Sequence, residues 1–428
     1  MQTMVVKIGS SSITDGDGRL SVERLQGLVA QLAEIQLSGR RQVVLVSSGA
    51  VAAGIGKLGW RRTNITMPEK QAAAAVGQGV LMHTYEQLFG AWGLAIGQVL
   101  LTRSDTADRS RFVHVRNTLM TLLHHGIIPI VNENDTVAVD EIRFGDNDTL
   151  ASLVALVTEA DELVLLTDVD GLYTGNPATD PLAVRISDVW EITEEMEAAA
   201  GGSGSRVGTG GMRTKVGAAK IAVAGGCDVV VASSAEPGVL LHLTRDIGGS
   251  PDSPGTIGHR SAADTSNRIH GVGDMGGAGN GQGSGQGNGN GNGGPCNRAD
   301  TISQRSGDKT SVGTRFHAKA EPVSLRKAWL IHGSRSEGEL VIDDGAVRAL
   351  RNHAASLLLP GVREVKGEFR EGAAVDLVDL TGSPIARGIV SFSARDLEFL
   401  IRRQQSGERL TDLPEVVHRN DMALVDRV

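Results

Sequence analysis

Residues 4–12 read MVVKIGSSS, a short apolar run that ends in a glycine and three serines. The run has the length and the β-branched content of a buried strand, so we predict a strand over residues 4–8. Lys7 stands inside it, and a lysine in a buried strand needs either a partner or a strand-end position that faces a ligand. Gly9 allows close approach of the backbone at the same place. This strand therefore ends in a candidate binding position.

The same pattern continues along the first half of the chain. Further strands are predicted at 42–46, 94–101, 127–131 and 162–167, and helices at 21–37, 71–89, 110–125 and 147–158. This alternation predicts an α/β fold with an open, mainly parallel sheet between helices. Ligands of such folds bind at the carboxyl ends of the strands. Here the loops at those ends read KIGSSS, VSSGAV, VNENDTV and LTDVDGLYT.

Residues 208–215, GTGGMRTK, lead from a glycine-rich turn into a predicted helix start that carries Arg213 and Lys215. A cation there costs about 0.3–1 kcal/mol, because the free N–H groups already make that end partly positive. An anion bound at the turn would explain both cations, and glycine-rich turns before helices are common phosphate sites. The stretch is not a Walker A loop, which requires GxxxxGK[ST]. The alternative is a flexible loop with two solvated cations.

Residues 132–148, NENDTVAVDEIRFGDND, contain six carboxylates in 17 residues. An anionic ligand alone would not favour Asp135 and Asp148, whereas the ammonium group of an amino acid would. Metal ions held by phosphate oxygens would also tolerate them. Asp146 and Asn147 are equally suited to helix capping. The stretch 167–174, TDVDGLYT, suits a nucleotide base and ribose, or else forms a tight hairpin.

The composition changes after the predicted sheet. Residues 271–294 contain 13 glycines in 24 positions and almost no hydrophobic side chains, which predicts disorder. Residues 317–428 regain short apolar runs, which predict a small, mainly β module. That module holds 16 basic and 17 acidic residues, so it has no overall nucleic-acid signature.

The bulk properties narrow the class of protein. The net charge of −8 argues against nucleic acid as the main partner. Cys227 and Cys296 match no metal or redox spacing, which fits a reducing compartment. The first residues, MQTMVVKIG, lack a secretory signal, and no apolar run reaches the roughly 18 residues that a membrane span needs. We therefore expect a cytoplasmic protein without a membrane partner.

Seven motifs, taken in their order and spacing, resemble the glutamate 5-kinase family of the amino-acid kinase superfamily. They are VVKIGSS, SSGAVAAG, LLTRSD, VNENDTV, FGDNDTLAS, LTDVDGLYT and GTGGMRTK. The resemblance covers roughly residues 4–247 and resumes at 313–322, GTRFHAKAEP, which resembles the last kinase strand. The C-terminal module resembles a PUA domain. The resemblance implies a kinase domain at 1–247, a glycine-rich insert at 248–312, and the last kinase strand with the PUA-like domain at 313–428.

The resemblance also implies roles for individual residues. Lys7 and Lys215 would contact the phosphates and the transferred group, and Asp148 would position the two lysines. Ser48, Asp135 and Asn147 would bind glutamate. The ATP site would be formed by Thr167, Asp168, Thr209, Gly210, Gly211, Met212, Arg213, Thr214 and Lys215, together with Lys7. No metal ligands are assigned.

The implied reaction is transfer of phosphate from ATP, with Mg²⁺, to the side-chain carboxylate of L-glutamate. Its product, glutamyl 5-phosphate, is the first intermediate of proline biosynthesis. The resemblance further implies feedback inhibition by proline, a homodimer or homotetramer, and hand-off of the product to glutamyl phosphate reductase.

Two other interpretations remain open from the residues. The first is another kinase of the superfamily, above all an acetylglutamate or uridylate kinase. A nucleotide acceptor would favour more basic loops. An acceptor whose amino group is acetylated has no ammonium charge for the carboxylate of Asp135 to bind. The second is an RNA-binding or regulatory role of the C-terminal module, against which its balanced charge counts.

Overall fold

The computed structural model describes residues 1–15, 18–60, 65–137, 147–177, 179–200, 211–245, 312–353, 355–406, 408 and 413–425. Residues 271–294, for which disorder is predicted, lie outside these ranges, as does the rest of the insert at 248–312 apart from Val312. Asp146, Thr209 and Gly210 also lie outside them.

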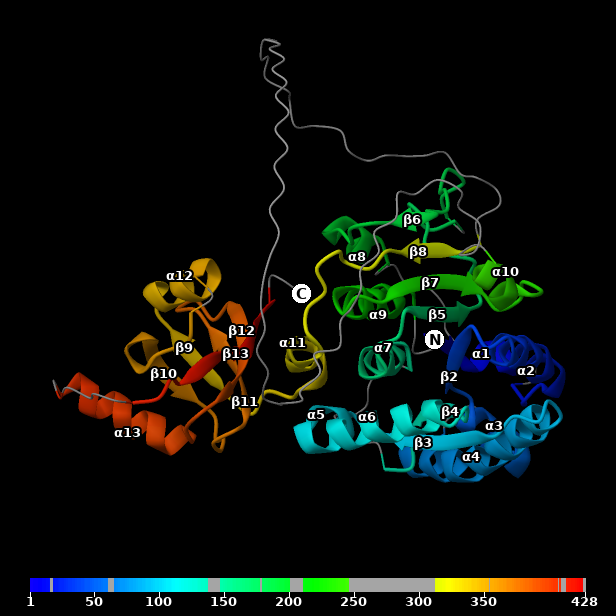
Figure 1. The fold of residues 1–428 in the computed structure, drawn as a ribbon, viewed down its shortest axis with the longest axis horizontal. Helices are drawn as coiled ribbons and strands as arrows, with labels where there is room; N and C mark the ends of the chain where they lie inside the picture. The colour runs from blue at the N-terminus through cyan, green and yellow to red at the C-terminus, as the bar shows by residue number, and fades with distance from the viewer. Residues whose placement is uncertain are drawn as a thin grey trace, which may run out of the picture.

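The first sheet has eight strands in the order β3-β4-β2-β1-β5-β7-β8-β6 (Figure 1). Their bounds are β1 Gln2–Ile8, β2 Arg41–Ser47, β3 Ile96–Leu101, β4 Ile128–Glu133, β5 Glu162–Thr167, β6 Asp188–Val189, β7 Asp228–Ser233 and β8 Thr314–Phe316. Neighbouring strands run parallel except β7 and β8. The mainly parallel sheet predicted from the sequence is confirmed.

Ten helices belong to this part of the described chain. They are α1 Ser10–Ile13, α2 Val22–Leu37, α3 Ala50–Leu58, α4 Met67–Gly90, α5 Arg103–Ala107, α6 Arg109–His124, α7 Asn147–Val157, α8 Glu194–Ala200, α9 Met212–Ala224 and α10 Val239–Arg245. Helices α2, α4, α6 and α7 match the four predicted helices closely. Helix α3, which starts within the SSGAVAAG motif, was not predicted as a helix.

The sheet separates two hydrophobic cores. Val5 of β1 lies in the core that α6, α7 and α9 cover, whereas Met4 and Val6 lie in the core that α2, α4 and α10 cover. Successive side chains of a strand point to opposite faces, so odd-numbered residues of β1 face α7 and α9. Figure 1 shows α7 and α9 on one side of the sheet and α2 and α10 on the other. Lys7 shares the face of Val5.

The C-terminal part forms a second sheet of five strands in the order β10-β9-β11-β12-β13. The strands are β9 Glu339–Ile342, β10 Val362–Lys366, β11 Ala374–Val378, β12 Pro384–Val390 and β13 Val417–Leu424. The helical segments are α11 Leu325–Ala328, a π-helix Trp329–Gly333, α12 Asp344–His353, a 3-10 turn Leu359–Gly361 and α13 Ala394–Gln405. This sheet encloses its own hydrophobic core, as expected for a small, mainly β module.

The π-helix joins the two parts of the chain. Trp329 donates a hydrogen bond from Nε1 to the carbonyl oxygen of Thr106 at 2.7 Å, and its ring lies 6.0 Å from that of Phe112. Trp329 is almost fully buried. The indole therefore anchors the start of the C-terminal part against α5 and α6.

Helices α3 and α4 pack backbone to backbone through two glycines. A Cβ atom at Gly54 would lie 1.8 Å from the carbonyl oxygen of Ala73, and one at Gly77 would lie 1.8 Å from that of Ala50. Neither oxygen belongs to a flexible side chain, so any larger residue must push the helices apart. Because α3 follows β2 directly, this packing also fixes the loop between them.

We expect Gly77→Ala to destabilise the protein by about 3 kcal/mol, since the added methyl group overpacks a backbone contact. Urea unfolding would measure the change. The matched control is Gly79→Ala on the same helix, where a Cβ atom would have nothing within 4 Å. That control should gain up to about 1 kcal/mol from helix propensity. Equal stabilities for the two variants would contradict the close packing.

Candidate active site

The carboxyl ends of the central parallel strands meet at one edge of the sheet, where several helices also begin. The N-caps of α1, α3 and α9 are Gly9, Gly49 and Gly211, and no side chain caps any of these helix starts. The first N–H groups of a helix have no partner within it, and the helix dipole makes that end partly positive. This edge of the sheet therefore favours the binding of anions.

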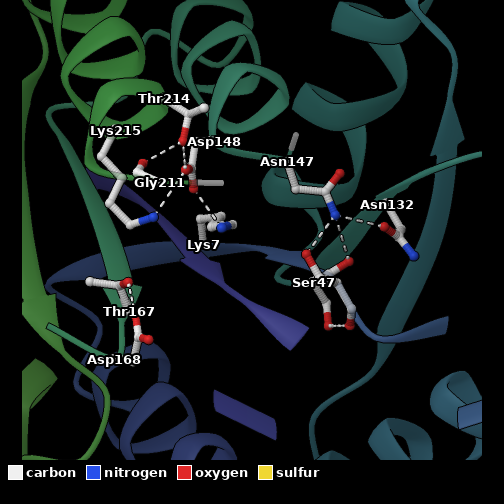
Figure 2. Close-up of polar contacts among 11 residues, drawn as sticks. Lys7, Ser47, Asn132, Asn147, Asp148, Thr167, Asp168, Gly211, Thr214 and Lys215 are labelled. Carbon is white, nitrogen blue, oxygen red and sulfur yellow. Dashed lines mark hydrogen bonds and ion pairs between the residues drawn. The ribbon is translucent and has the colours of Figure 1, made fainter. Parts of the chain in front are cut away.

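A buried carboxylate lies between two lysines at this edge (Figure 2). Lys7 Nζ is 2.5 Å from Asp148 Oδ1, and Lys215 Nζ is 3.3 Å from Asp148 Oδ2. The exposed fractions are 6% for Lys7, 4% for Lys215 and 0% for Asp148. The hydroxyl oxygen of Thr214 lies 2.8 Å from Asp148 Oδ2 and 2.8 Å from the carbonyl oxygen of Gly211. The cluster carries one net positive charge when all three groups are ionised.

Burial by itself raises the pKa of the Asp148 carboxyl group. The positive charges of Lys7 and Lys215, with hydrogen bonds from Lys7 and Thr214, outweigh burial and bring the pKa below its usual value. Asp148 therefore stays ionised at neutral pH. A permanent carboxylate holds both ammonium groups in place and leaves part of their charge for a ligand.

Local structure explains how these three residues meet. Lys7 is the last residue but one of β1 and points to the face of α7 and α9. Asp148 is the second residue of α7, where the helix dipole favours a carboxylate. Lys215 lies in the first turn of α9, and side chains of a helix lean toward its N-terminus.

A second polar cluster is built around Asn147, the residue next to Asp148. Asn147 Nδ2 donates to Ser48 Oγ at 2.8 Å and to Asn132 Oδ1 at 3.0 Å. Asn132 lies at the end of β4 and donates from Nδ2 to Gln78 Oε1 at 2.9 Å. Beside Ser48, Ser47 Oγ lies 2.8 Å from the hydroxyl oxygen of Tyr85. Figure 2 shows the lysine cluster and this amide cluster on either side of the first turn of α7.

The other residues proposed for the ATP site lie farther along the same edge. Thr167 ends β5 and its hydroxyl lies 3.0 Å from Asp168 Oδ1, which is exposed. Gly211 and Met212 begin α9 and are partly buried.

The structure separates the two cations of GTGGMRTK. Arg213 is exposed and lines a pocket between α8 and α9 with Glu197, Val216 and Lys220, rather than joining Lys215 beside Asp148. Residues two apart on a helix do not face the same way, which is the physical reason for the separation.

Asp135 lies in the turn after β4, half-buried. It is near in sequence to Asn132, which belongs to the amide cluster.

Sequence reasoning did not single out Asn132, Gln78 or Tyr85. Asn132 is the first residue of NEND and could have been found as the polar residue that ends a buried strand. Gln78 and Tyr85 stand seven residues apart on α4, so they share one buried face of that helix. The signal available was a pair of polar groups at helical spacing on an otherwise apolar face.

No group of three or more His, Cys, Asp or Glu side chains in the described ranges is arranged to hold a metal ion. No helix in those ranges is long and apolar enough to cross a membrane.

Comparison with known proteins shows the family of each part of the chain. The model of the amino acid kinase family matches residues 2–233, and the model of the PUA domain matches residues 338–406. The first match covers more than half of the chain, and the chain therefore belongs to the amino acid kinase family. A UMP kinase from Ureaplasma parvum of known structure covers 57% of this chain and 95% of its own, with 15% identity and a TM-score of 0.40. That likeness is too weak to bear on the substrate.

Full-length relatives define the group more narrowly. The glutamate 5-kinase of Moorella thermoacetica is 41% identical over 99% of this chain and 96% of its own. That of Carboxydothermus hydrogenoformans is 40% identical over 100% of this chain and 98% of its own, and glutamate 5-kinase 2 of Bacillus subtilis is 40% identical over 93% and 90%. Within the amino acid kinase family, the chain belongs to the glutamate 5-kinases.

Proposed function

We propose that this chain transfers the γ-phosphoryl group of ATP to the side-chain carboxylate of L-glutamate, forming glutamyl 5-phosphate and ADP. One observation carries the proposal. The adjacent residues Asn147 and Asp148, at the start of α7, belong to two different polar clusters. Asp148 holds the two lysines, which suit phosphates, and Asn147 lies among uncharged hydrogen-bonding groups, which suit an amino acid. The two substrates would thus meet across a single helix turn.

The reaction needs no general base. The acceptor carboxylate has a pKa of about 4.3 and is already ionised at neutral pH. One of its oxygens attacks the γ-phosphorus, the bond from that phosphorus to the bridging oxygen breaks, and ADP leaves with the electron pair. Such reactions are catalysed mainly by positioning and by neutralising charge. We assign that neutralisation to Lys7 and Lys215.

Two helix starts near the lysines suit the phosphates of ATP. A Cβ atom at Gly9 would lie 3.7 Å from Lys7 Nζ, and one at Gly211 would have nothing within 4 Å. Both glycines start helices whose first N–H groups carry no side-chain cap. We assign the nucleotide to this region, to Thr167 and Asp168, and to the residues from Thr209 to Lys215.

Magnesium belongs to the proposal as a companion of ATP. Bound Mg²⁺ would neutralise part of the phosphate charge.

The remaining assignments come from membership of the glutamate 5-kinases. We propose a cytoplasmic enzyme of proline biosynthesis that is inhibited by proline, assembles as a homodimer or homotetramer and passes its product to glutamyl phosphate reductase. We also propose the division into a kinase domain at 1–247, an insert at 248–312, and the last kinase strand with the PUA domain at 313–428.

The test of the proposed function is ADP release from ATP and Mg²⁺ with L-glutamate, N-acetylglutamate, aspartate, carbamate and UMP as separate acceptors. Hydroxylamine in the assay traps an acyl phosphate as its hydroxamate. We expect turnover with L-glutamate alone and formation of the hydroxamate. Turnover with another acceptor, without L-glutamate, would remove Ser48, Asp135 and Asn147 from their assigned roles.

The variant Asp135→Ala tests whether Asp135 binds the amino group of glutamate. We propose that the Asp135 carboxylate binds the ammonium of glutamate, and loss of a charge-assisted hydrogen bond costs about 1.5–3 kcal/mol. The KM for glutamate should therefore rise by about 10-fold to 100-fold, with little change in the KM for ATP. Steady-state kinetics would measure both. An unchanged KM for glutamate would remove Asp135 from the substrate site.

A further inference from the structure

We propose that Gln78 is a positioning residue for the amino-acid substrate. Together with the backbone N–H of Glu133, it holds the amide group of Asn132, and through it that of Asn147, in one of their two possible orientations. The inference rests on the proposed function, because it concerns the residues assigned to glutamate.

The hydrogen bonds between the amides have a direction. Gln78 Oε1 accepts from Asn132 Nδ2 at 2.9 Å, and Asn132 Oδ1 accepts from Asn147 Nδ2 at 3.0 Å and from the backbone N–H of Glu133 at 2.9 Å. The NH₂ group of an asparagine only donates and its oxygen only accepts. If the amide of Asn132 were reversed, its NH₂ group would face that of Asn147. The backbone N–H of Glu133 can only donate, so it requires the oxygen of Asn132 on this side, and Gln78 Oε1 holds the NH₂ group on the other side.

The orientation decides what Asn147 offers to a substrate. Both hydrogens of its NH₂ group are directed to Asn132 and Ser48. Its carbonyl oxygen points away from these partners in Figure 2. A carbonyl oxygen accepts from an ammonium group, whereas a reversed amide would present N–H groups to it. Gln78 thereby favours a substrate with a free amino group.

Helix α4 holds Gln78 rigidly. Gln78 is 9% exposed, and the neighbouring Gly77 packs against the backbone of Ala50. One buried face of the helix carries both Gln78 and Tyr85, whose hydroxyl lies 2.8 Å from Ser47 Oγ. Burial raises the pKa of Tyr85 well above its usual value, so its hydroxyl keeps its proton. The helix thus contacts the amide cluster at Asn132 and also contacts Ser47, the residue before Ser48.

The experiment compares steady-state kinetics of the full chain with Gln78→Met, Gln78→Glu and Gln87→Met. Gln78→Met keeps the length of the side chain but removes the acceptor, and we expect the KM for glutamate to rise about 10-fold with kcat and the KM for ATP within about two-fold. Gln78→Glu restores an acceptor oxygen, although it buries a carboxyl group, and should raise the KM for glutamate less than Gln78→Met does. Gln87 is exposed on the same helix, so Gln87→Met is the matched control and should behave as wild type.

Combination with Asn147→Ala distinguishes positioning from a general structural effect. If Gln78 acts through Asn147, Gln78→Met should raise the KM for glutamate no further in the Asn147→Ala background. An equal rise in both backgrounds, or an unchanged KM in the single variant, would overturn the inference. Should Gln78→Met fail to fold, Gln78→Asn, one methylene shorter, answers the same question. A wild-type chain that turns over ATP with no glutamate dependence would instead defeat the proposed function itself.

Discussion

Replacing Lys215 with alanine is expected to lower kcat by about 100-fold to 1,000-fold, with a much smaller effect on the KM for glutamate. Loss of one fixed group that stabilises transition-state charge in a buried site has effects of this size. Lys215 is 4% exposed and is held by Asp148. Water therefore cannot easily provide the charge stabilisation that is lost with its ammonium group. Lys7→Ala should behave in the same way, because Lys7 is the other cation on the same carboxylate.

The matched control for this prediction is Lys220→Ala. Lys220 lies on the same helix, is exposed, and forms an ion pair of 2.6 Å with Glu197, away from Asp148. Its loss should leave kcat within about two-fold, since an exposed ion pair contributes about 0–1 kcal/mol. Near-normal turnover of Lys7→Ala or Lys215→Ala, with only a raised KM for glutamate, would show that the lysines bind substrate and do not stabilise the transition state.

Most of the first sheet could be predicted from the sequence, because buried parallel strands leave short apolar runs between helices of regular period. Helix α3 was missed for a physical reason. Its sequence is rich in glycine and alanine, and Gly54 is required there by the backbone of Ala73, which is a tertiary contact. Strand β6 has only two residues, and β8 pairs antiparallel with β7 from beyond the insert. Pairings of that kind depend on distant parts of the chain.

The residues of the candidate site also divide into those that the sequence predicts and those that it does not. A lysine in a buried strand predicted a partner or a ligand for Lys7, and the structure provides Asp148 as the partner. The link from Gln78 to Asn132 spans 54 positions and joins a helix to a strand end, so no local pattern reveals it. The GTGGMRTK motif predicts one anion for both of its cations, but helical geometry directs Arg213 and Lys215 to different sides of α9.

Asp148→Asn is expected to impair both activity and stability. The variant leaves two buried ammonium groups without their counter-ion, and breaking a buried ion pair from one side costs about 3–5 kcal/mol. Urea unfolding at pH 7 would measure that loss, with the exposed Asp344→Asn as a control that should change stability by less than about 0.5 kcal/mol. We expect kcat to fall by at least about 100-fold, because Lys7 and Lys215 lose their common anchor.

The pH dependence of the unfolding free energy separates the effect of the charge of Asp148 from the effect of its shape. Its pKa is lowered in the folded protein, so the stabilisation from its ionised form is fully present above the unfolded pKa of about 3.9. It is lost as the pH falls through the lower folded pKa. The difference in unfolding free energy between wild type and Asp148→Asn should therefore be constant between about pH 5 and pH 8 and should shrink below about pH 4. A difference that persists unchanged in acid would mean that asparagine fails for its packing, and that the carboxylate charge does not hold the two lysines.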